Sequence, residues 1–138
     1  MIEVIGISKR FKEVIAVNSI SFKVEKGKVF GLLGENGAGK TTTLRILATM
    51  LKPTSGTATI NGYDLINDPE EIRGEIGILF GGEAGLYDRL TARENIEYFG
   101  LLNGMDKNDI DNRIKELASI LEMEEFIENA VTVMGILG

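Results

Sequence analysis

A glycine-rich run at residues 34–41, which reads Gly-Glu-Asn-Gly-Ala-Gly-Lys-Thr, constrains the fold of this chain more than any other feature. It matches the pattern G-x-x-x-x-G-K-[ST] at every fixed position, and that pattern binds phosphate where a strand gives way to a helix. The apolar run at residues 29–33 stands directly before it and predicts a strand buried on both faces. Apolar residues at helical spacing after it predict a helix over residues 40–51. We therefore expect a strand–loop–helix unit of an α/β protein.

The chemistry of this run favours a polyphosphate. Glycines at positions 34, 37 and 39 can adopt backbone conformations that a Cβ disfavours, so successive N–H groups can point toward one anion. A helix N-terminus adds only about 0.3–1 kcal/mol, which is too little on a chain whose formal net charge is −6. Lys40 is expected to supply positive charge at the β- and γ-phosphates, and the Thr41 hydroxyl is expected to bind Mg²⁺. A plain glycine-rich turn would have no need of Lys-Thr at this spacing.

Further strands are predicted on both sides of the loop. Residues 2–7 are rich in β-branched side chains, and apolar and polar residues alternate over 20–24. Residues 57–60, followed by Asn61-Gly62, predict a short strand and a turn. The apolar run 76–80 predicts another strand. The first third of the chain is thus expected to form an antiparallel flap beside the loop.

Helices are expected mainly in the second half. Asp68 followed by Pro69 has the pattern of a helix start. Thr91 and Glu94 have the spacing of a capping box before an amphipathic segment. A further amphipathic helix is predicted over residues 110–121. The expected fold class is α/β, with an antiparallel N-terminal flap and a helical C-terminal part.

Composition excludes several kinds of function. The chain has no Cys and no His, which excludes a disulfide framework, a thiolate metal site and an imidazole base. Asp and Glu number 21 against 15 Lys and Arg, so nucleic acid is not an expected partner. Its apolar runs are too short to span a bilayer, and no secretory signal is visible, so no membrane insertion is expected. The GTPase patterns D-x-x-G and N-K-x-D are missing from the sequence, which disfavours GTP.

The wider run 30–44 closely resembles the ATP-binding subunits of ABC transporters. Lys9-Arg10-Phe11 before the segment 19–22, Pro53-Thr54-Ser55-Gly56, Asn61-Gly62 and the segment 85–95 also resemble this family. The resemblance covers roughly residues 1–128 and is greatest to bacterial exporter subunits of the drug, sodium or antibiotic-efflux type. It implies a P-loop NTPase core with an N-terminal β flap and the start of a helical subdomain, using ATP and Mg²⁺.

The resemblance also implies roles for particular residues. The nucleotide would be bound by Phe11, Gly34, Glu35, Asn36, Gly37, Ala38, Gly39, Lys40, Thr41 and Thr42. Phe11 would stack on adenine, the alternative being that it packs within the flap. Thr41 would bind Mg²⁺. Gly81 stands where the family usually has the Gln of its Q-loop, and Glu83 lies close enough to substitute, although a plain surface glutamate is the alternative.

The resemblance further implies that this is the N-terminal part of an ATP-binding domain. Residues 1–80 would be the β flap and P-loop core, 81–128 the Q-loop-like loop and helical subdomain, and 129–138 an atypical tail from a truncation or a changed reading frame. The family's signature, its acidic strand end and its switch His do not appear. We therefore assign no catalytic residue and expect MgATP binding with little or no hydrolysis. In the family, the strand that ends in the acidic pair lies beside the strand matching residues 29–33. Without it residues 29–33 would have an unpaired edge, so we also expect a marginally stable or associating chain.

The implied partners are a transmembrane permease subunit and a second ATP-binding subunit across a dimer interface. The implied location is peripheral, on the cytoplasmic face of the cell membrane. One alternative is a truncated, non-hydrolysing nucleotide-binding or interaction fragment. Another is a soluble ABC-type ATPase of translation or repair, but such proteins typically carry two cassettes or inserted segments, which this sequence does not show.

Overall fold

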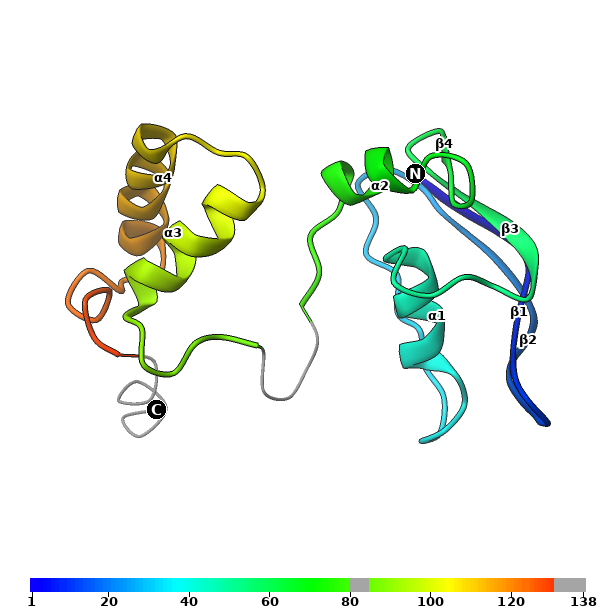
Figure 1. The fold of residues 1–138 in the computed structure, drawn as a ribbon. Coiled ribbons are helices and arrows are strands. Elements are labelled where there is room, and N and C mark those ends of the chain that lie inside the picture. The colour runs from blue at the N-terminus through cyan, green and yellow to red at the C-terminus, as the bar shows by residue number, and fades with distance from the viewer. Residues whose placement is uncertain (80–84, 131–138) are drawn as a thin grey trace. The chain divides into compact units, whose positions relative to one another are not determined.

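The computed structural model describes residues 1–79 and 85–130, and the chain divides into two compact units, Met1–Leu79 and Phe80–Gly138 (Figure 1). The first unit contains a sheet with two helices, and the second contains two further helices. The predicted Q-loop positions Gly81 and Glu83 lie outside the described residues, as does most of the tail 129–138.

The sheet of the first unit is antiparallel throughout. Its strands are β1 (Ile2–Phe11), β2 (Val14–Val24), β3 (Ser55–Ile60) and β4 (Tyr63–Asp64), in the order β2-β1-β3-β4. Val4 of β1 is paired with Phe22 on one side and Ala58 on the other, so β1 is a central strand. The strands predicted at residues 2–7, 20–24 and 57–60 are confirmed, and β1 and β2 extend further than predicted because they form one long hairpin.

The core of the first unit lies between one face of this sheet and two short helices, α1 (Lys40–Leu47) and α2 (Pro69–Glu75). Ile46 of α1 and Ile72 of α2 are fully buried against strand residues. Each such side chain contributes about 1.5–3 kcal/mol when removed from water. The buried residues of this core are Val4, Ile7, Val17, Ile46, Ala58, Ile60, Leu65 and Ile72.

Helix α1 is shorter than predicted. It was expected to reach residue 51, but it ends at Leu47 because the backbone at Thr49 turns left-handed, with φ 58°. The Thr49 amide donates to the Ile46 carbonyl at 3.0 Å, and the Met50 amide donates to the Arg45 carbonyl at 3.0 Å. These two bonds form a Schellman motif, which closes a helix by satisfying its last carbonyls.

Two predicted strands are wrong. Residues 29–33 and the described part of 76–80 are irregular, and Val29, Leu33 and Leu79 are almost fully exposed. A strand needs a neighbour that pairs its backbone N–H and C=O groups, and among the described residues neither segment has one. Within the 29–33 segment, the ring of Phe30 stacks on Phe22 of β2 at a centroid distance of 4.9 Å.

The second unit is built on α3 (Ala92–Leu102) and α4 (Lys107–Ile120). The predicted capping box is confirmed, because the Thr91 hydroxyl accepts from the Glu94 amide at 3.1 Å and the Glu94 carboxylate accepts from the Thr91 amide at 2.7 Å. Ile110, Ile114 and Ile127 form its buried core. In the described ranges 1–79 and 85–130, no helix has the length and apolar content needed to cross a bilayer.

Candidate functional site

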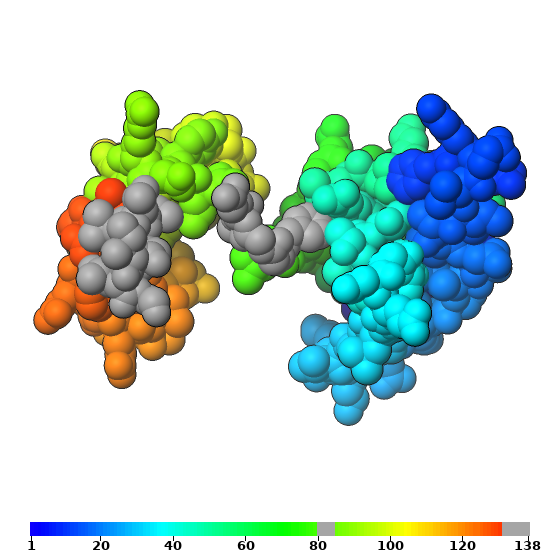
Figure 2. Space-filling view, turned by 90° about the horizontal axis from the view of Figure 1, so that it is seen from below, coloured from blue at the N-terminus to red at the C-terminus, as the bar shows by residue number. Residues whose placement is uncertain are grey.

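Two of the three loop glycines expected to take conformations that a Cβ disfavours, Gly37 and Gly39, are left-handed, and Gly34 is not. Gly37 has φ 87° and Gly39 has φ 86°, both in the region that glycine occupies at little cost. Gly39 is also the N-cap of α1, so the loop leads directly into the helix at Lys40. Figure 2 shows this part of the chain, coloured cyan, at the surface of its unit. The free N–H groups of the first turn of α1 therefore lie next to an accessible loop.

The loop is held against β2 by the absence of a side chain at Gly39. A Cβ placed there would lie 2.2 Å from the carbonyl oxygen of Ala16 and 3.1 Å from Cγ2 of Val17. The first distance is far below van der Waals contact, and it involves backbone, which cannot rotate away. Glycine at position 39 is therefore required both by its φ angle and by the close approach of β2.

Two adjoining clefts lie along the loop. The smaller has a volume of about 210 Å³ and is lined by Ala16, Asn36, Gly37, Gly39, Lys40, Thr41 and Thr42. The larger, about 360 Å³, shares Ala16, Gly37 and Lys40 with it and extends to β2 and to residues 32–33. Neither cleft has a carboxylate among its described lining residues. The smaller cleft thus combines a helix N-terminus, an ammonium group and two hydroxyls, which is a composition suited to an anion.

Lys40 lies across its own loop. Its Nζ donates to the carbonyl of Gly34 at 2.5 Å and to the carbonyl of Glu35 at 2.6 Å. Both acceptors are neutral, so the ammonium keeps its full positive charge for an anion. A bound phosphate would compete with these two carbonyls or take the third N–H of the ammonium.

The three threonines after Lys40 differ in exposure. Thr41 is exposed and Thr42 is half-buried, and both line the smaller cleft. Thr43 is buried, and its hydroxyl donates to the carbonyl of Gly39 at 2.9 Å. Thr41 and Thr42 can therefore present hydroxyls to a ligand or a metal, whereas the Thr43 hydroxyl bonds to the backbone of the loop. Within the described residues there is no group of three or more acidic side chains that could hold a metal by itself.

The structure brings most of the predicted nucleotide-binding residues together. Asn36, Gly37, Gly39, Lys40, Thr41 and Thr42 line the smaller cleft, and Ala38 lines the larger one. Gly34 and Glu35 contribute the carbonyls that hold Lys40. Phe11 is different, because it lies at the end of β1 and lines neither cleft. Its ring is 45% exposed, with the ammonium of Lys9 5.1 Å from the ring centroid.

Sequence reasoning missed the contributions of Ala16 and Thr43. Ala16 lines both clefts and its carbonyl is the atom closest to Gly39. It lies on β2, and no local pattern in the sequence predicts which strand approaches the loop. Thr43 could have been noticed as the third of three consecutive threonines, at the helix spacing that places its side chain near the carbonyl four residues earlier.

The second unit has a group of exposed aromatic side chains. Tyr87, Tyr98 and Phe99 are each 38–48% exposed, and their ring centroids lie 5.1–6.4 Å apart. Asn95, which is 2% exposed, positions this group by accepting from the Tyr87 amide at 2.8 Å and donating to the Tyr87 carbonyl at 3.1 Å. The hydroxyl of Tyr87 donates to that of Tyr98 at 3.3 Å, which raises the pKa of Tyr87. We call Tyr87, Tyr98 and Phe99 the aromatic cluster.

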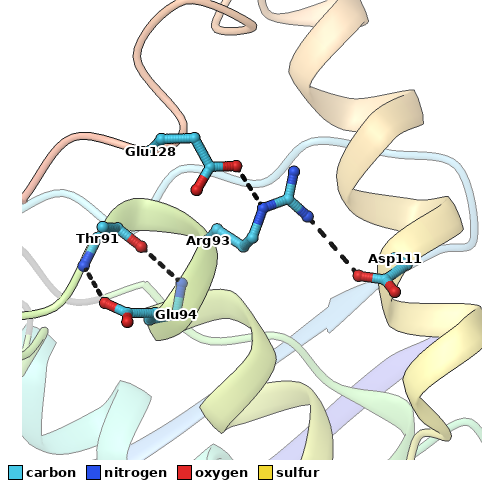
Figure 3. A network of polar contacts seen from close by, with 5 residues as sticks. All are labelled: Thr91, Arg93, Glu94, Asp111 and Glu128. Carbon is cyan, nitrogen blue, oxygen red and sulfur yellow. Dashed lines mark hydrogen bonds and ion pairs between the residues drawn. The ribbon is translucent and has the colours of Figure 1, made fainter.

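A network of charged side chains holds the start of α3 to the segment that follows α4 (Figure 3). Arg93 Nε donates to Glu128 at 2.6 Å, and Arg93 Nη1 lies 3.7 Å from Asp111 on α4. The Glu128 carboxylate raises the pKa of Arg93. The Arg93 amide also donates to the Ile127 carbonyl at 2.9 Å. These contacts are structural, since they connect residues within this unit.

Comparison with known proteins shows similarity to ABC transporter proteins, both to a family model and to individual relatives. A protein-family model described as "ABC transporter" matches residues 17–135. The "ABC transporter ATP-binding protein NatA" of Bacillus subtilis is 46% identical over 135 residues, which are 95% of this chain and 55% of that protein. The "Doxorubicin resistance ATP-binding protein DrrA" of Mycobacterium tuberculosis is 40% identical over 114 residues, which are 81% of this chain and 34% of that protein.

A solved structure agrees with these sequence relatives. It is described as the dimeric structure of MJ0796, a bacterial ABC transporter cassette, and it superposes with a TM-score of 0.78 at 25% identity. The similarity covers 94% of this chain and 61% of that one. The chain thus spans about half the length, or less, of the curated relatives named above.

Proposed function

The chain belongs to the ABC transporter family, and from that premise we propose that its residues form the N-terminal, MgATP-binding part of a subunit that energises a bacterial exporter. Two relatives are described as ATP-binding proteins, and one of them as a doxorubicin resistance protein. The observation that carries the proposal is the smaller cleft, where Gly37, Gly39, Lys40 and Thr41 surround a space at the N-terminus of α1.

In this proposal the phosphates of ATP occupy the smaller cleft. The N–H groups of the loop and of the first turn of α1 donate to the phosphate oxygens, and Lys40 supplies the charge that those dipoles lack. The Thr41 hydroxyl would be a ligand of Mg²⁺, with the phosphates supplying further oxygens. Asn36 and Thr42 complete the wall, Ala38 lines the adjoining larger cleft, and Gly34 and Glu35 act through their bonds to Lys40.

We further propose that Phe11 stacks on the adenine. Its ring is nearly half exposed at the end of β1, in the same unit as the loop. Stacking of a base on an aromatic side chain contributes about 1–3 kcal/mol in single-stranded nucleic acid complexes. The ammonium of Lys9 lies over the ring and attracts its electron-rich face. Gly81 and Glu83 are proposed as the Q-loop positions of the complete subunit.

We propose that these residues bind MgATP but hydrolyse it weakly. Phosphoryl transfer to water needs a residue that orients the water or accepts its proton. Among the described residues that line the two clefts there is no carboxylate, and the chain has no imidazole. This favours the second candidate function, a non-hydrolysing nucleotide-binding fragment, for the 138 residues taken alone.

The proposed partners are a second ATP-binding subunit and a transmembrane permease subunit. The first is supported by the solved cassette, which is described as dimeric. The second is supported by the exposed aromatic cluster, because aromatic side chains are enriched where proteins contact one another. The subunit would then lie peripherally on the cytoplasmic face of the membrane. Residues 1–80 are assigned to the flap and P-loop core, 81–128 to the Q-loop-like loop and helical subdomain, and 129–138 to the tail.

A thermal-shift experiment tests nucleotide binding directly. A ligand at 100 times its Kd stabilises the folded state by about 2.7 kcal/mol. We expect MgATP to raise the Tm of the wild-type chain and of Lys26→Ala, and to leave the Tm of Lys40→Ala unchanged. Lys26 is an exposed residue in the turn after β2, so its replacement changes the net charge equally without touching the clefts. A shift that persists in Lys40→Ala, or none in the wild type, would refute the proposal.

A further inference from the structure

We propose that Thr43 is a positioning residue for the nucleotide site: its buried hydroxyl fixes the direction of the Gly39–Lys40 peptide, and thereby points the Lys40 amide at the phosphates. The inference rests on the proposed binding of MgATP at the loop. It assigns a function to a side chain that lines the larger cleft and not the smaller one, where the phosphates are proposed to bind.

The observation behind the proposal is a polar contact made by a buried side chain of α1. Thr43 is 2% exposed, and within residues 1–79 it is the only buried polar side chain. Its hydroxyl donates to the Gly39 carbonyl at 2.9 Å, and its amide donates to the same oxygen at 2.8 Å. A threonine in a helix can bond the carbonyl four residues earlier in this way. The hydroxyl and the amide of Thr43 thus occupy both lone pairs of the Gly39 carbonyl oxygen.

Peptide geometry transfers this constraint to the ligand site. The Gly39 carbonyl and the Lys40 amide belong to one planar trans peptide, in which the C=O and N–H bonds point in opposite directions. When Thr43 holds the carbonyl along α1, the Lys40 N–H must point out of the N-terminus of the helix. Lys40 lines the smaller cleft there, so this N–H is directed toward the proposed phosphates.

The constraint adds to the close packing of Gly39 against Ala16 of β2, because no side-chain hydrogen bond caps this helix start. Gly39 has no side chain, and the N-terminus of α1 has no side-chain cap. A glycine populates positive and negative φ with similar ease, so its peptide can turn unless hydrogen bonds prevent it. The amide of Thr43 provides the ordinary helical bond, and its hydroxyl adds a second bond that narrows the range of orientations.

The test compares the affinities of MgATP, MgADP and adenosine, measured by calorimetry on the full chain. Thr43→Val keeps the shape of the side chain and removes the hydroxyl. We expect it to weaken MgATP and MgADP by about three- to tenfold, the scale of one net hydrogen bond. Adenosine has no phosphate and should bind Thr43→Val and the wild type equally. Thr43→Ser keeps the hydroxyl and should restore the wild-type affinity to within about twofold, because the bond to Gly39 is kept.

Matched controls separate positioning from stability. Ile46 lies on α1, three residues after Thr43, and is also buried. Ile46→Val removes one buried methylene there, so it destabilises the same helix without changing the loop. It should leave all three affinities unchanged. If Thr43→Val does not fold, as judged by far-UV circular dichroism, the comparison of Thr43→Ser with Thr43→Ala decides the matter, because these variants differ by one oxygen atom.

Several results would overturn the positioning role. Equal MgATP affinity in Thr43→Val and the wild type is one, and an equal loss for adenosine is another. The same loss in Ile46→Val, or equal affinities in Thr43→Ser and Thr43→Ala, would also refute it. A wild-type chain that binds none of the nucleotides would instead refute the proposed function itself, which the thermal-shift comparison with Lys40→Ala detects independently.

Discussion

Replacing Gly39 with alanine should destabilise the first unit through two separate effects. The backbone at this position has φ 86°, and a Cβ would lie 2.2 Å from the Ala16 carbonyl oxygen of β2. The left-handed conformation costs a non-glycine residue about 1–2 kcal/mol. Forcing an extra methyl group into a packed site costs about 1–3 kcal/mol more, because backbone must move. We therefore expect Gly39→Ala to lower the free energy of unfolding by about 2–5 kcal/mol.

Gly37 provides the matched control for this substitution. Its φ is 87°, nearly the same as that of Gly39, but a Cβ added there would meet no atom within 4 Å. Gly37→Ala should therefore show the conformational cost alone, about 1–2 kcal/mol. The difference between the two variants isolates the steric contact between the loop and β2.

Urea unfolding followed by far-UV circular dichroism measures both variants. The free energy of unfolding is obtained by linear extrapolation, and equal slopes indicate that only stability has changed. The reasoning is refuted if Gly39→Ala and Gly37→Ala are destabilised to the same extent, within about 0.5 kcal/mol, the usual scatter for such differences. That result would mean that β2 does not approach the loop as closely as the structure has it.

Two further predictions concern hydrogen-bonded side chains. Asn95→Ala should destabilise the second unit by about 1–3 kcal/mol, because it leaves partly buried backbone groups of Tyr87 unpaired. Hydrogen exchange should show faster exchange of the Tyr87 amide, which loses its bond to Asn95. The amides of Asn67 and Ile66 hold the pKa of Asp64 below its ordinary 3.8. This contribution to stability is therefore complete above pH 3.8 and is lost as the pH falls through the lowered value. Asp64→Asn should lower the urea midpoint at pH 7, and the midpoint of this variant should decline less steeply below pH 4 than that of the wild type. An equally steep decline below pH 4 in both proteins would contradict this.

Local signals in the sequence predicted a large part of this structure. The capping box of Thr91 and Glu94 was confirmed because both partners lie within four residues of each other. The start of α1 at Lys40 followed from the glycines and the phosphate-binding pattern, and the N-terminal strands from their β-branched residues. The phosphate-binding loop could be recognised because its spacing is set by the phosphate group that such loops bind. The ABC family was recognised from the wider run 30–44 together with segments such as 85–95.

Other features depended on contacts between distant residues. Residues 29–33 have the composition of a buried strand, but composition does not supply the neighbouring strand that would pair with them. The end of α1 at Leu47 results from a left-handed turn at Thr49, a β-branched residue that local preference would not place there. Phe11 was assigned to the nucleotide by resemblance, yet no sequence pattern sets its distance from the loop.

The sequence by itself determined that this chain has a phosphate-binding loop, because backbone freedom at the glycines and the charge of Lys40 are properties of those residues. The tertiary structure decided how that loop is held. The approach of Ala16 to Gly39 and the burial of Thr43 both require the β-hairpin and α1 to pack together, whereas the bond from the Thr43 hydroxyl to the Gly39 carbonyl lies within one helical turn. Steric exclusion and burial exist only between segments in contact, so neither can be predicted from a linear pattern.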